Sequence, residues 1–260
     1  MIDYIQMPDV VLITNRPRLT FTKNSACIER MLSRMSVAGT VSGECPLWAA
    51  SMQDAILRSI SAELRGDIPH FSFYLFTDYD TPFELEDVQT MYKTIRDDDT
   101  IDAIYPVQAA RHWDRAIVHG YDVDYSTETT DVPLGHFGLT FVRRSAFGLT
   151  KDKNNRAAHL PWFMGIPNRQ GLWLQANEHD PNGMVADDMY FWNSLRTNGG
   201  RIVLHNRIQV GHMGPAVMWA EGDGNGGTKI RWQTMKDYEA HGKPDDLAPI
   251  EYYKPEEAAV

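Results

Sequence analysis

Short apolar runs alternate with amphipathic stretches along the first part of the chain. The run 10–14 (VVLIT) is β-branched and apolar, which is typical of a strand buried on both faces of a sheet. The runs 71–76 (FSFYLF) and 101–105 (IDAIY) have the same character. Asn15-Arg16-Pro17 and Pro106 are expected to end the first and third of these strands.

Two intervening segments have the spacing of helices. In 51–64 and 84–96, apolar residues recur at intervals of three and four, so each segment places one stripe against a core. The second segment also begins acidic and ends basic, in keeping with the helix dipole. Strands and helices that alternate at these lengths predict βαβ units and an open, mostly parallel α/β sheet.

The pattern changes after about residue 108. Residues 111–133 are polar and aromatic without a clean period, which predicts a long functional loop or an irregular hairpin. A strand and a turn are expected in 136–148, a helix in 184–198, and one or two short strands in 201–212. No internal repeat or long linker divides the chain, so we predict one domain. The Pro- and acid-rich segment from Lys243 is expected to be a frayed tail.

Composition narrows the class of protein. The 260 residues carry a formal net charge of -10, so the chain lacks the global positive field of a dedicated nucleic-acid binder. Cys27 and Cys45 form neither a metal-type spacing nor a disulfide framework, which favours a reducing compartment. The N-terminal apolar run is too short for a signal peptide or a membrane span, and we expect a cytoplasmic protein without a transmembrane segment.

Asp78 and Asp80 follow the apolar run 71–76 directly. Buried strands of open α/β sheets deliver their carboxyl ends to the crevice where ligands bind. Two carboxylates there suit Mg²⁺ or Mn²⁺, which keep further positions for water and substrate phosphates. A polar turn is the alternative, and for the other Asp-x-Asp triplets, at 97–99 and 122–124, a solvated connector or surface loop is the better interpretation.

A second acidic pair, Asp187-Asp188, opens the helix expected in 184–198. Acidic residues stabilise a helix N-terminus through the dipole alone, so capping explains the pair as well as catalysis does. As a catalytic group, one carboxylate is a candidate base, sugar-hydroxyl ligand or nucleophile.

His212 follows an apolar strand, and a Gly-rich segment comes after it. Imidazole is a common ligand beside carboxylates, although a single histidine is more often structural. Residues 213–231 form either a disordered loop or a lid that closes over a substrate. In a lid, Lys229 and Arg231 are placed to meet a phosphate.

The order of these motifs resembles that of metal-dependent glycosyltransferases of the GT-A fold. The segment 10–17 (VVLITNRP) is similar to the first strand and nucleotide-contacting turn of that fold, and 73–83 (FYLFTDYDTPF) is similar to its Asp-x-Asp segment. The segments 161–163 (PWF) and 186–204 (ADDMYFWNSLRTNGGRIVL) resemble its acidic helix, glycine turn and next strand. The segment 210–214 (VGHMG) resembles the metal-binding histidine segment of several branches, including retaining ones.

The resemblance implies a single GT-A (Rossmann-like) domain over residues 1–242 with a mostly parallel sheet, flanking helices and a small antiparallel extension. Its nucleotide-binding half spans about 8–108 and its acceptor and catalytic half about 109–242, followed by the tail 243–260. The implied activity moves a sugar from a nucleoside-diphosphate sugar, with UDP favoured, to an acceptor hydroxyl, with Mn²⁺ or Mg²⁺ as cofactor.

Site roles follow from the same resemblance. Asp80 matches the direct metal ligand, Asp78 the carboxylate that faces the ribose and the metal shell, and His212 the third ligand. Asp187 and Asp188 match the acidic pair between donor sugar and acceptor. The residues matched to donor contacts are Thr14, Asn15 and Arg16, with Asp54 on the next helix as a further nucleotide contact.

Some features depart from the family. Alanine 186 stands where many relatives have an acidic residue, which leaves open whether Asp187 or Asp188 acts, and the Gln-x-x-Arg-Trp segment of processive synthases is missing. The chemical outcome, retaining or inverting, and the acceptor stay open: glycan, lipid-linked sugar, protein or modified nucleobase. The rival functions are a nucleotidyltransferase and a non-catalytic carbohydrate-binding module with the tryptophans Trp113, Trp162, Trp173 and Trp219 as platforms.

Overall fold

The computed structural model describes residues 4–15, 28–43, 48–109, 116–117, 123–149, 162–165, 187–213 and 216–250. The elements along the described chain are β1 (Ile5–Asn15), β2 (Met35–Gly43), α2 (Trp48–Leu64), β3 (Phe73–Asp78), α3 (Leu85–Asp97), β4 (Ala103–Ala109), β5 (Ala116–Ile117), β6 (Thr129–Asp131), β7 (Leu139–Arg143), α4 (Ala146–Leu149), α5 (Asp187–Thr197), β8 (Ile202–Met213), β9 (Ala216–Gly222), β10 (Thr228–Thr234) and α6 (Met235–His241). Both helices expected in the first half, and the helix expected near 184–198, are present.

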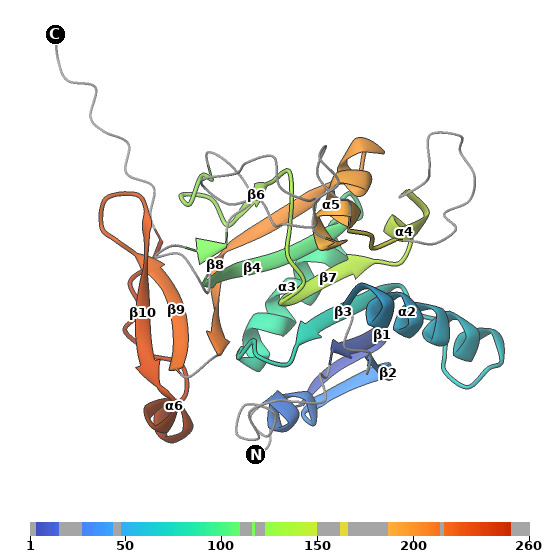
Figure 1. Ribbon diagram of the computed structural model, residues 1–260, viewed down its shortest axis with the longest axis horizontal. Coiled ribbons are helices and arrows are strands. Elements are labelled where there is room, and N and C mark those ends of the chain that lie inside the picture. Colours follow the sequence, from blue (N-terminus) through green and yellow to red (C-terminus); the bar gives the residue numbers. More distant parts are fainter. Residues whose placement is uncertain are drawn as a thin grey trace, which may run out of the picture.

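The strands form one mixed sheet in the order β10-β9-β8-β4-β7-β3-β1-β2, with β5 beside β4 and β6 beside β8 (Figure 1). Pairing is parallel between β1 and β2, β1 and β3, and β4 and β8. Strand β7 is antiparallel to both β3 and β4, so β3 and β4 still run in the same direction. The predicted α/β class is confirmed, but antiparallel pairs are more frequent than expected because β7 enters the middle of the sheet and β8 to β10 form a meander.

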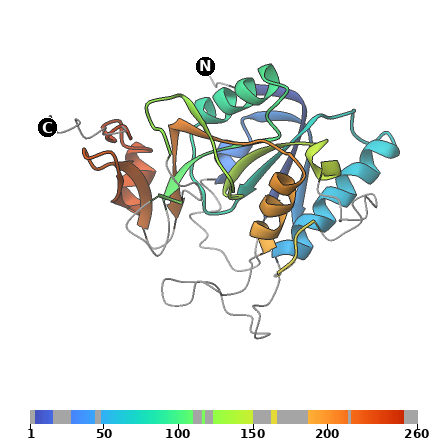
Figure 2. The same ribbon diagram turned by 90° about the horizontal axis from the view of Figure 1, so that it is seen from above.

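Helices cover both faces of the sheet (Figure 2). Helix α3 packs its apolar stripe on one face, where Val88, Met91 and Ile95 are fully buried against β1, β3 and β7. Helices α2, α4 and α5 cover the other face, which holds a dense aromatic cluster around Phe137, where Phe137 and Trp192 stack with centroids 4.5 Å apart. Burial on both faces explains the unbroken apolar runs of the central strands.

Strand β4 continues through Pro106, contrary to the prediction that this proline ends it. The parallel pairing with β8 shifts its register between Pro106 and Val107, so the proline sits at an irregularity of the ladder. Because proline has no N–H to donate, a register shift is a place where a strand accommodates it at low cost. The strand therefore reaches Ala109 and carries Gln108 toward the site described below.

The Gly-rich segment is a hairpin rather than the predicted lid or loop. Strands β9 and β10 pair antiparallel from Ala216–Thr234 to Gly222–Thr228. In the turn between them, Gly224 and Gly226 have φ of 80° and 82°, and the Asp223 carboxylate accepts the N–H groups of Asn225 and Gly227. Positive φ is strained for other residues, so the glycines serve this turn.

Residues 243–250 are packed, which corrects the expectation of a frayed tail from Lys243 onward. The Lys243 ammonium donates to the Gln209 carbonyl at 2.9 Å, and Gly222 N donates to Ala248 O at 2.9 Å. Ile250 is buried. This stretch packs against the last residue of β9, at the turn end of the hairpin, while 251–260 lie outside the described residues.

Buried His205 gives the fold a predicted acid sensitivity. Its side chain lies within β8, with the Glu128 carboxylate 3.5 Å from Nε2, and burial outweighs that contact and lowers the pKa of the imidazole below its usual 6.5. The unfolded chain therefore binds the proton more strongly, so stability is lost as pH falls below about 6.5 toward the folded-state pKa. We expect the unfolding free energy, measured in urea between pH 7.5 and 5, to fall less steeply in His205→Leu. His241→Gln, at the end of α6, is the control and should keep the slope of the natural protein; an unchanged slope in His205→Leu contradicts the prediction.

Candidate functional site

The carboxyl ends of β1 and β3 meet at one edge of the sheet. Asn15 and Asp78 are partners in the parallel register, as are Thr14 and Thr77 one residue earlier. The chain turns at Tyr79-Asp80 immediately after β3. The predicted placement of Asp78 and Asp80 at the end of a buried strand is therefore confirmed as a structural feature.

Asp80 and His212 converge although they are distant in sequence. The His212 Nε2 atom lies 3.6 Å from Asp80 Oδ2, and both side chains are largely buried, at 13% and 4% exposure. Backbone contacts fix the approach, because Met213 N donates to Asp80 O at 2.6 Å and Gly211 N donates to Pro82 O at 3.0 Å. These two backbone hydrogen bonds thus join the turn after β3 to the end of β8.

The orientation of the His212 ring follows from its second nitrogen. His212 Nδ1 lies 2.9 Å from the carbonyl oxygen of Ala109, the last residue of β4. A carbonyl only accepts, so Nδ1 carries the hydrogen, and in the neutral imidazole Nε2, the atom that faces Asp80, then carries the lone pair. This is the second-contact arrangement that metal-ligating histidines use to fix their tautomer.

Gln108 ties the two sides of this pair together. Its buried amide nitrogen donates to Thr81 Oγ1 at 2.9 Å and to Gly211 O at 3.2 Å. Thr81 follows Asp80 and Gly211 precedes His212, so a single side chain holds the neighbours of both residues. A Cβ on Gly138 would lie 2.2 Å from Gln108 Oε1, which explains why only a glycine fits against this amide.

Gly211 lets the two strands approach closely. A Cβ there would stand 2.7 Å from Pro82 Cγ and 2.9 Å from Val217 Cγ1. The residue is buried at the crossing of the Asp80 turn, β8 and β9. Its lack of a side chain is a condition for the Asp80–His212 approach.

Asp78 has a different partner. The indole Nε1 of Trp48, the first residue of α2, donates to Asp78 Oδ1 at 3.4 Å. The Trp48 ring packs on Phe137 and Phe163, with centroids 5.3 and 5.1 Å away. The carboxylate of Asp78 is thereby directed toward the α2 side of the sheet edge.

The donor set at Asp80 and His212 fits a divalent cation. Ligands at about 2.0–2.2 Å from one ion stand roughly 3–3.6 Å apart when they occupy neighbouring positions. One carboxylate and one imidazole suit Mn²⁺ and leave positions for water and phosphate oxygens. Within the described ranges no group of three His, Cys, Asp or Glu side chains could hold a metal ion together, so Asp78 is not grouped with Asp80 and His212, and those two residues stay candidate ligands.

The other predicted donor contacts are distributed along the same edge or beyond the described residues. Thr14 is buried at the end of β1, and its Oγ1 has no hydrogen-bond partner among the described residues. Asn15 is the last residue of β1, and Arg16 lies outside the described residues. Nothing in these positions tests the predicted contact with a nucleotide.

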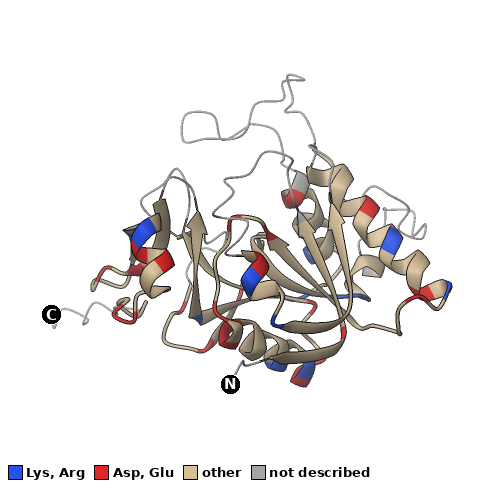
Figure 3. Cartoon of the chain, turned by 90° about the horizontal axis from the view of Figure 1, so that it is seen from below, with Lys and Arg blue, Asp and Glu red and all other residues tan. Residues whose placement is uncertain are grey.

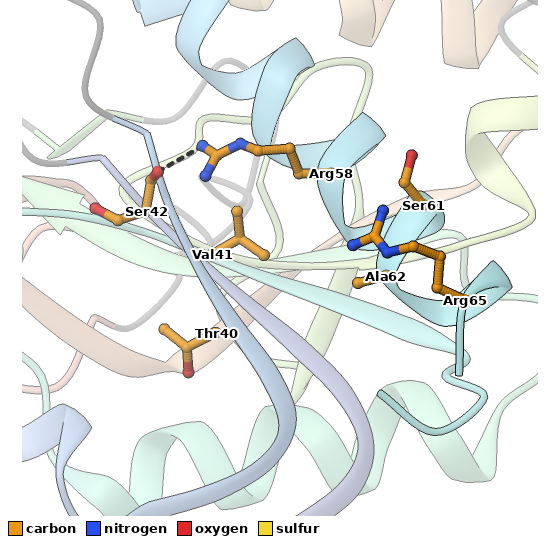
Figure 4. Close-up of a pocket in the computed structure, with 7 residues that line it drawn as sticks. All are labelled: Thr40, Val41, Ser42, Arg58, Ser61, Ala62 and Arg65. Carbon is orange, nitrogen blue, oxygen red and sulfur yellow. Dashed lines mark hydrogen bonds between the residues drawn. The ribbon is translucent and has the colours of Figure 1, made fainter. Parts of the chain in front are cut away.

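Asp54 lies on α2, next to a groove at the β2 border of the sheet. A cavity of about 440 Å³ lies between β2 and α2, and Figure 4 shows Arg58 directed from the helix toward Ser42 of the strand. Asp54 binds the Arg58 guanidinium at 2.7 Å, and the same guanidinium donates to Ser42 O at 2.7 Å. The described lining residues include Arg58 but not Asp54, Asp80 or His212, so Asp54 stands beside this groove through its contact with Arg58.

Lys229 and Arg231 are engaged by acidic residues. The Glu221 carboxylate lies 3.4 Å from Lys229 Nζ and 2.9 Å from Arg231 Nη2, and Asp246 lies 2.5 Å from Arg231 Nη1. These contacts hold the hairpin to the segment that follows α6. Both cations thus have structural partners, and their predicted contact with a phosphate stays a prediction.

Asp187 and Asp188 begin α5. Asp188 is half-buried, and its Oδ1 accepts the N–H of Met189 at 2.8 Å. This contact belongs to the first turn of the helix and is compatible with capping as well as with a catalytic role. The side chain of Asp187 lies outside the described residues.

Two residues of the site were not predicted from the sequence. Gln108 and Trp48 are first recognised from their contacts with Thr81, Gly211 and Asp78. The only signal for Gln108 was a polar residue directly after an apolar strand, and that strand was expected to end at Pro106.

Comparisons with known proteins define the fold but not the activity. No protein-family model and no curated protein matches the sequence. Among solved structures, the chain is similar to A197 from STIV, with a TM-score of 0.52 and 13% identity over 94% of this chain and 99% of that one. A glycosyltransferase involved in the glycosylation of the major capsid of PBCV-1 matches with a TM-score of 0.30 and 12% identity over 60% and 69% of the two chains. The first likeness indicates a shared fold, and the second is too weak to carry an argument.

Two surface properties bear on partners. None of the helices in the described ranges is long and apolar enough to cross a bilayer. Acidic and basic residues are interspersed in the view of Figure 3.

Arg144 is paired with Glu63 at 2.6 Å, and Arg143 donates to the carbonyls of Ile95, Asp98 and Ile101. These two arginines are thus committed to the fold.

Proposed function

We propose that this protein transfers a sugar from a nucleoside-diphosphate sugar to an acceptor hydroxyl. The observation that carries the proposal is the 3.6 Å approach of Asp80 and His212 at the carboxyl edge of a mixed α/β sheet. Ligands of open α/β sheets bind at this edge. The order of the sequence motifs, which resembles that of GT-A glycosyltransferases, supports the same conclusion independently.

One set of residues is placed for the diphosphate of the donor, and another set for its nucleoside. Asp80 and His212 would hold a Mn²⁺ or Mg²⁺ ion, which would supply positive charge to the leaving diphosphate. Asp78, held by Trp48, stands at the edge where β1 ends with Thr14 and Asn15, and this edge would receive the nucleoside. The closely packed turn around Gly211 and Gln108 fixes the geometry of the Asp80–His212 contact.

Asp188 is the proposed catalytic carboxylate of the acceptor side, with Asp187 beside it. In an inverting reaction it removes the proton of the attacking hydroxyl, and in a retaining one it stabilises positive charge at the sugar. The contact between Asp188 Oδ1 and Met189 N orients the carboxylate at the start of α5.

A panel of nucleotide sugars tests the proposal. UDP- and GDP-linked hexoses are incubated with the protein and Mn²⁺, and release of the nucleoside diphosphate is measured with and without EDTA. We expect slow, metal-dependent hydrolysis of one donor in the absence of acceptor. Release of pyrophosphate from a nucleoside triphosphate and a sugar phosphate supports a nucleotidyltransferase instead, and saccharide binding without turnover supports a non-catalytic module.

Replacing Gln108 should weaken cation binding more than it weakens the fold. Gln108→Leu removes both hydrogen bonds and loosens the neighbours of Asp80 and His212. We expect about tenfold weaker Mn²⁺ binding, measured by electron paramagnetic resonance, since loss of outer contacts to metal ligands costs roughly 10–100-fold.

Gln209→Leu is the matched control. Like Gln108 of β4, Gln209 of β8 is buried, and its amide donates to two acceptors, Ala220 O at 3.0 Å and Ala248 O at 3.3 Å. This variant should lose comparable stability and keep its Mn²⁺ affinity. Equal effects of the two substitutions on Mn²⁺ binding contradict the role given to Gln108.

A further inference from the structure

Trp232 is an exposed indole on the strand at one end of the sheet. It lies on β10 and is 61% exposed, whereas the other four tryptophans of the described ranges are buried or half-buried. Trp162 and Trp219, two of the sugar platforms considered from the sequence, are 8% and 1% exposed and belong to the core. The exposed ring of Trp232 therefore offers a flat apolar surface to a ligand.

Strand pairing places Trp232 in one row with His212. His212 is the antiparallel partner of Met218, and Met218 is the partner of Trp232. Directly paired residues project from the same face of a sheet. Neighbouring strands are about 4.8 Å apart, so the Trp232 backbone lies roughly 10 Å from that of His212 along this row.

The face of β10 that carries Trp232 is uncharged. Alternation along the strand puts Thr228, Ile230 and Thr234 on the same side as Trp232. Lys229 and Arg231 project from the opposite side, where Glu221 pairs with both. No described cation on this side of β10 is available for a phosphate, so the surface suits a neutral ligand.

We propose that Trp232 is the stacking platform for a neutral saccharide acceptor. The inference rests on the proposed function, because the cation at His212 marks the position of the diphosphate. The transferred sugar occupies the next position, and the attacking hydroxyl must come within about 3–3.5 Å of its anomeric carbon. The acceptor ring therefore lies one sugar ring away from the diphosphate. That distance is comparable with the roughly 10 Å between the backbones of His212 and Trp232. An indole offers such a ring a flat apolar surface for its C–H face.

The test separates acceptor binding from donor binding. Glucose, galactose, mannose, N-acetylglucosamine and their disaccharides are screened by saturation-transfer NMR, and UDP with Mn²⁺ is titrated in parallel by calorimetry. In the natural protein we expect saturation transfer to the C–H protons of at least one saccharide. Trp232→Ala should lower the affinity for that saccharide at least tenfold and leave the affinity for UDP–Mn²⁺ unchanged.

Two further variants define the outcome. Trp232→Phe should retain most of the binding, and Leu64→Ala, which removes an 81% exposed apolar side chain at the end of α2, should change nothing. If no saccharide binds, or if Trp232→Ala binds the saccharide with normal affinity, the proposed role of Trp232 is refuted. The UDP–Mn²⁺ titration tests the proposed function separately. Light scattering that shows a dimer lost in Trp232→Ala also refutes it, because a second copy then covers the ring.

Discussion

Asp80→Asn is expected to abolish metal-dependent donor binding and to leave the fold intact. The substitution keeps the shape of a side chain that is 4% exposed and removes the charge that a cation requires. Loss of an outer contact alone costs roughly 10–100-fold in metal affinity, so loss of a direct ligand should exceed about 100-fold. Calorimetric titration of UDP in the presence of Mn²⁺ measures the effect, and thermal unfolding checks the fold.

The chain contains its own control for this experiment. Asp97 belongs to another Asp-x-Asp triplet, is 52% exposed, and binds only the neighbouring Arg96 in the described contacts. Asp97→Asn should bind UDP and Mn²⁺ normally. If Asp80→Asn also binds them with unchanged affinity, the cation site is wrong and the sugar-transfer proposal loses its support.

Asp188→Asn is expected to reduce turnover by about 10²–10⁴ while donor affinity stays within a factor of two or so, which is the range for loss of a general acid or base. An asparagine oxygen can still accept the Met189 N–H, so the helix start is preserved. The rate of sugar transfer is compared with the UDP–Mn²⁺ dissociation constant. Parallel losses in rate and affinity would assign Asp188 to the helix terminus instead, and a larger loss in Asp187→Asn would transfer the catalytic role to its neighbour.

The helices and strands that have a clear pattern of apolar residues could be predicted from the sequence. The runs 10–14 and 71–76 are buried on both faces, and the apolar stripe of 84–96 matches the packing of α3. Strand β2 was missed because its sequence, MSVAGTVSG, has small residues and a half-buried pattern at the border of the sheet. Its stability comes from pairing with β1, which local propensity does not report.

Long-range contacts explain what the sequence could not give. The approach of Asp80 and His212 was a hypothesis based on motif order, and its geometry depends on the Gln108 amide, more than 100 residues from Gly211. Likewise, the Gly-rich segment has the composition of a mobile loop. It forms a hairpin because Glu221 pairs with Lys229 and Arg231 and the chain after α6 packs over it.

The contact between Arg58 and Ser42 has a consequence for solubility. Strand β2 ends the sheet in the described part of the chain, and an unpaired strand border is a template for intermolecular β-pairing and fibre formation. The Arg58 guanidinium, anchored by Asp54, occupies the Ser42 carbonyl and places a charged group over that border. The ion pair therefore removes one free acceptor from this border and places charge beside it, which disfavours pairing with a strand of another chain at that point.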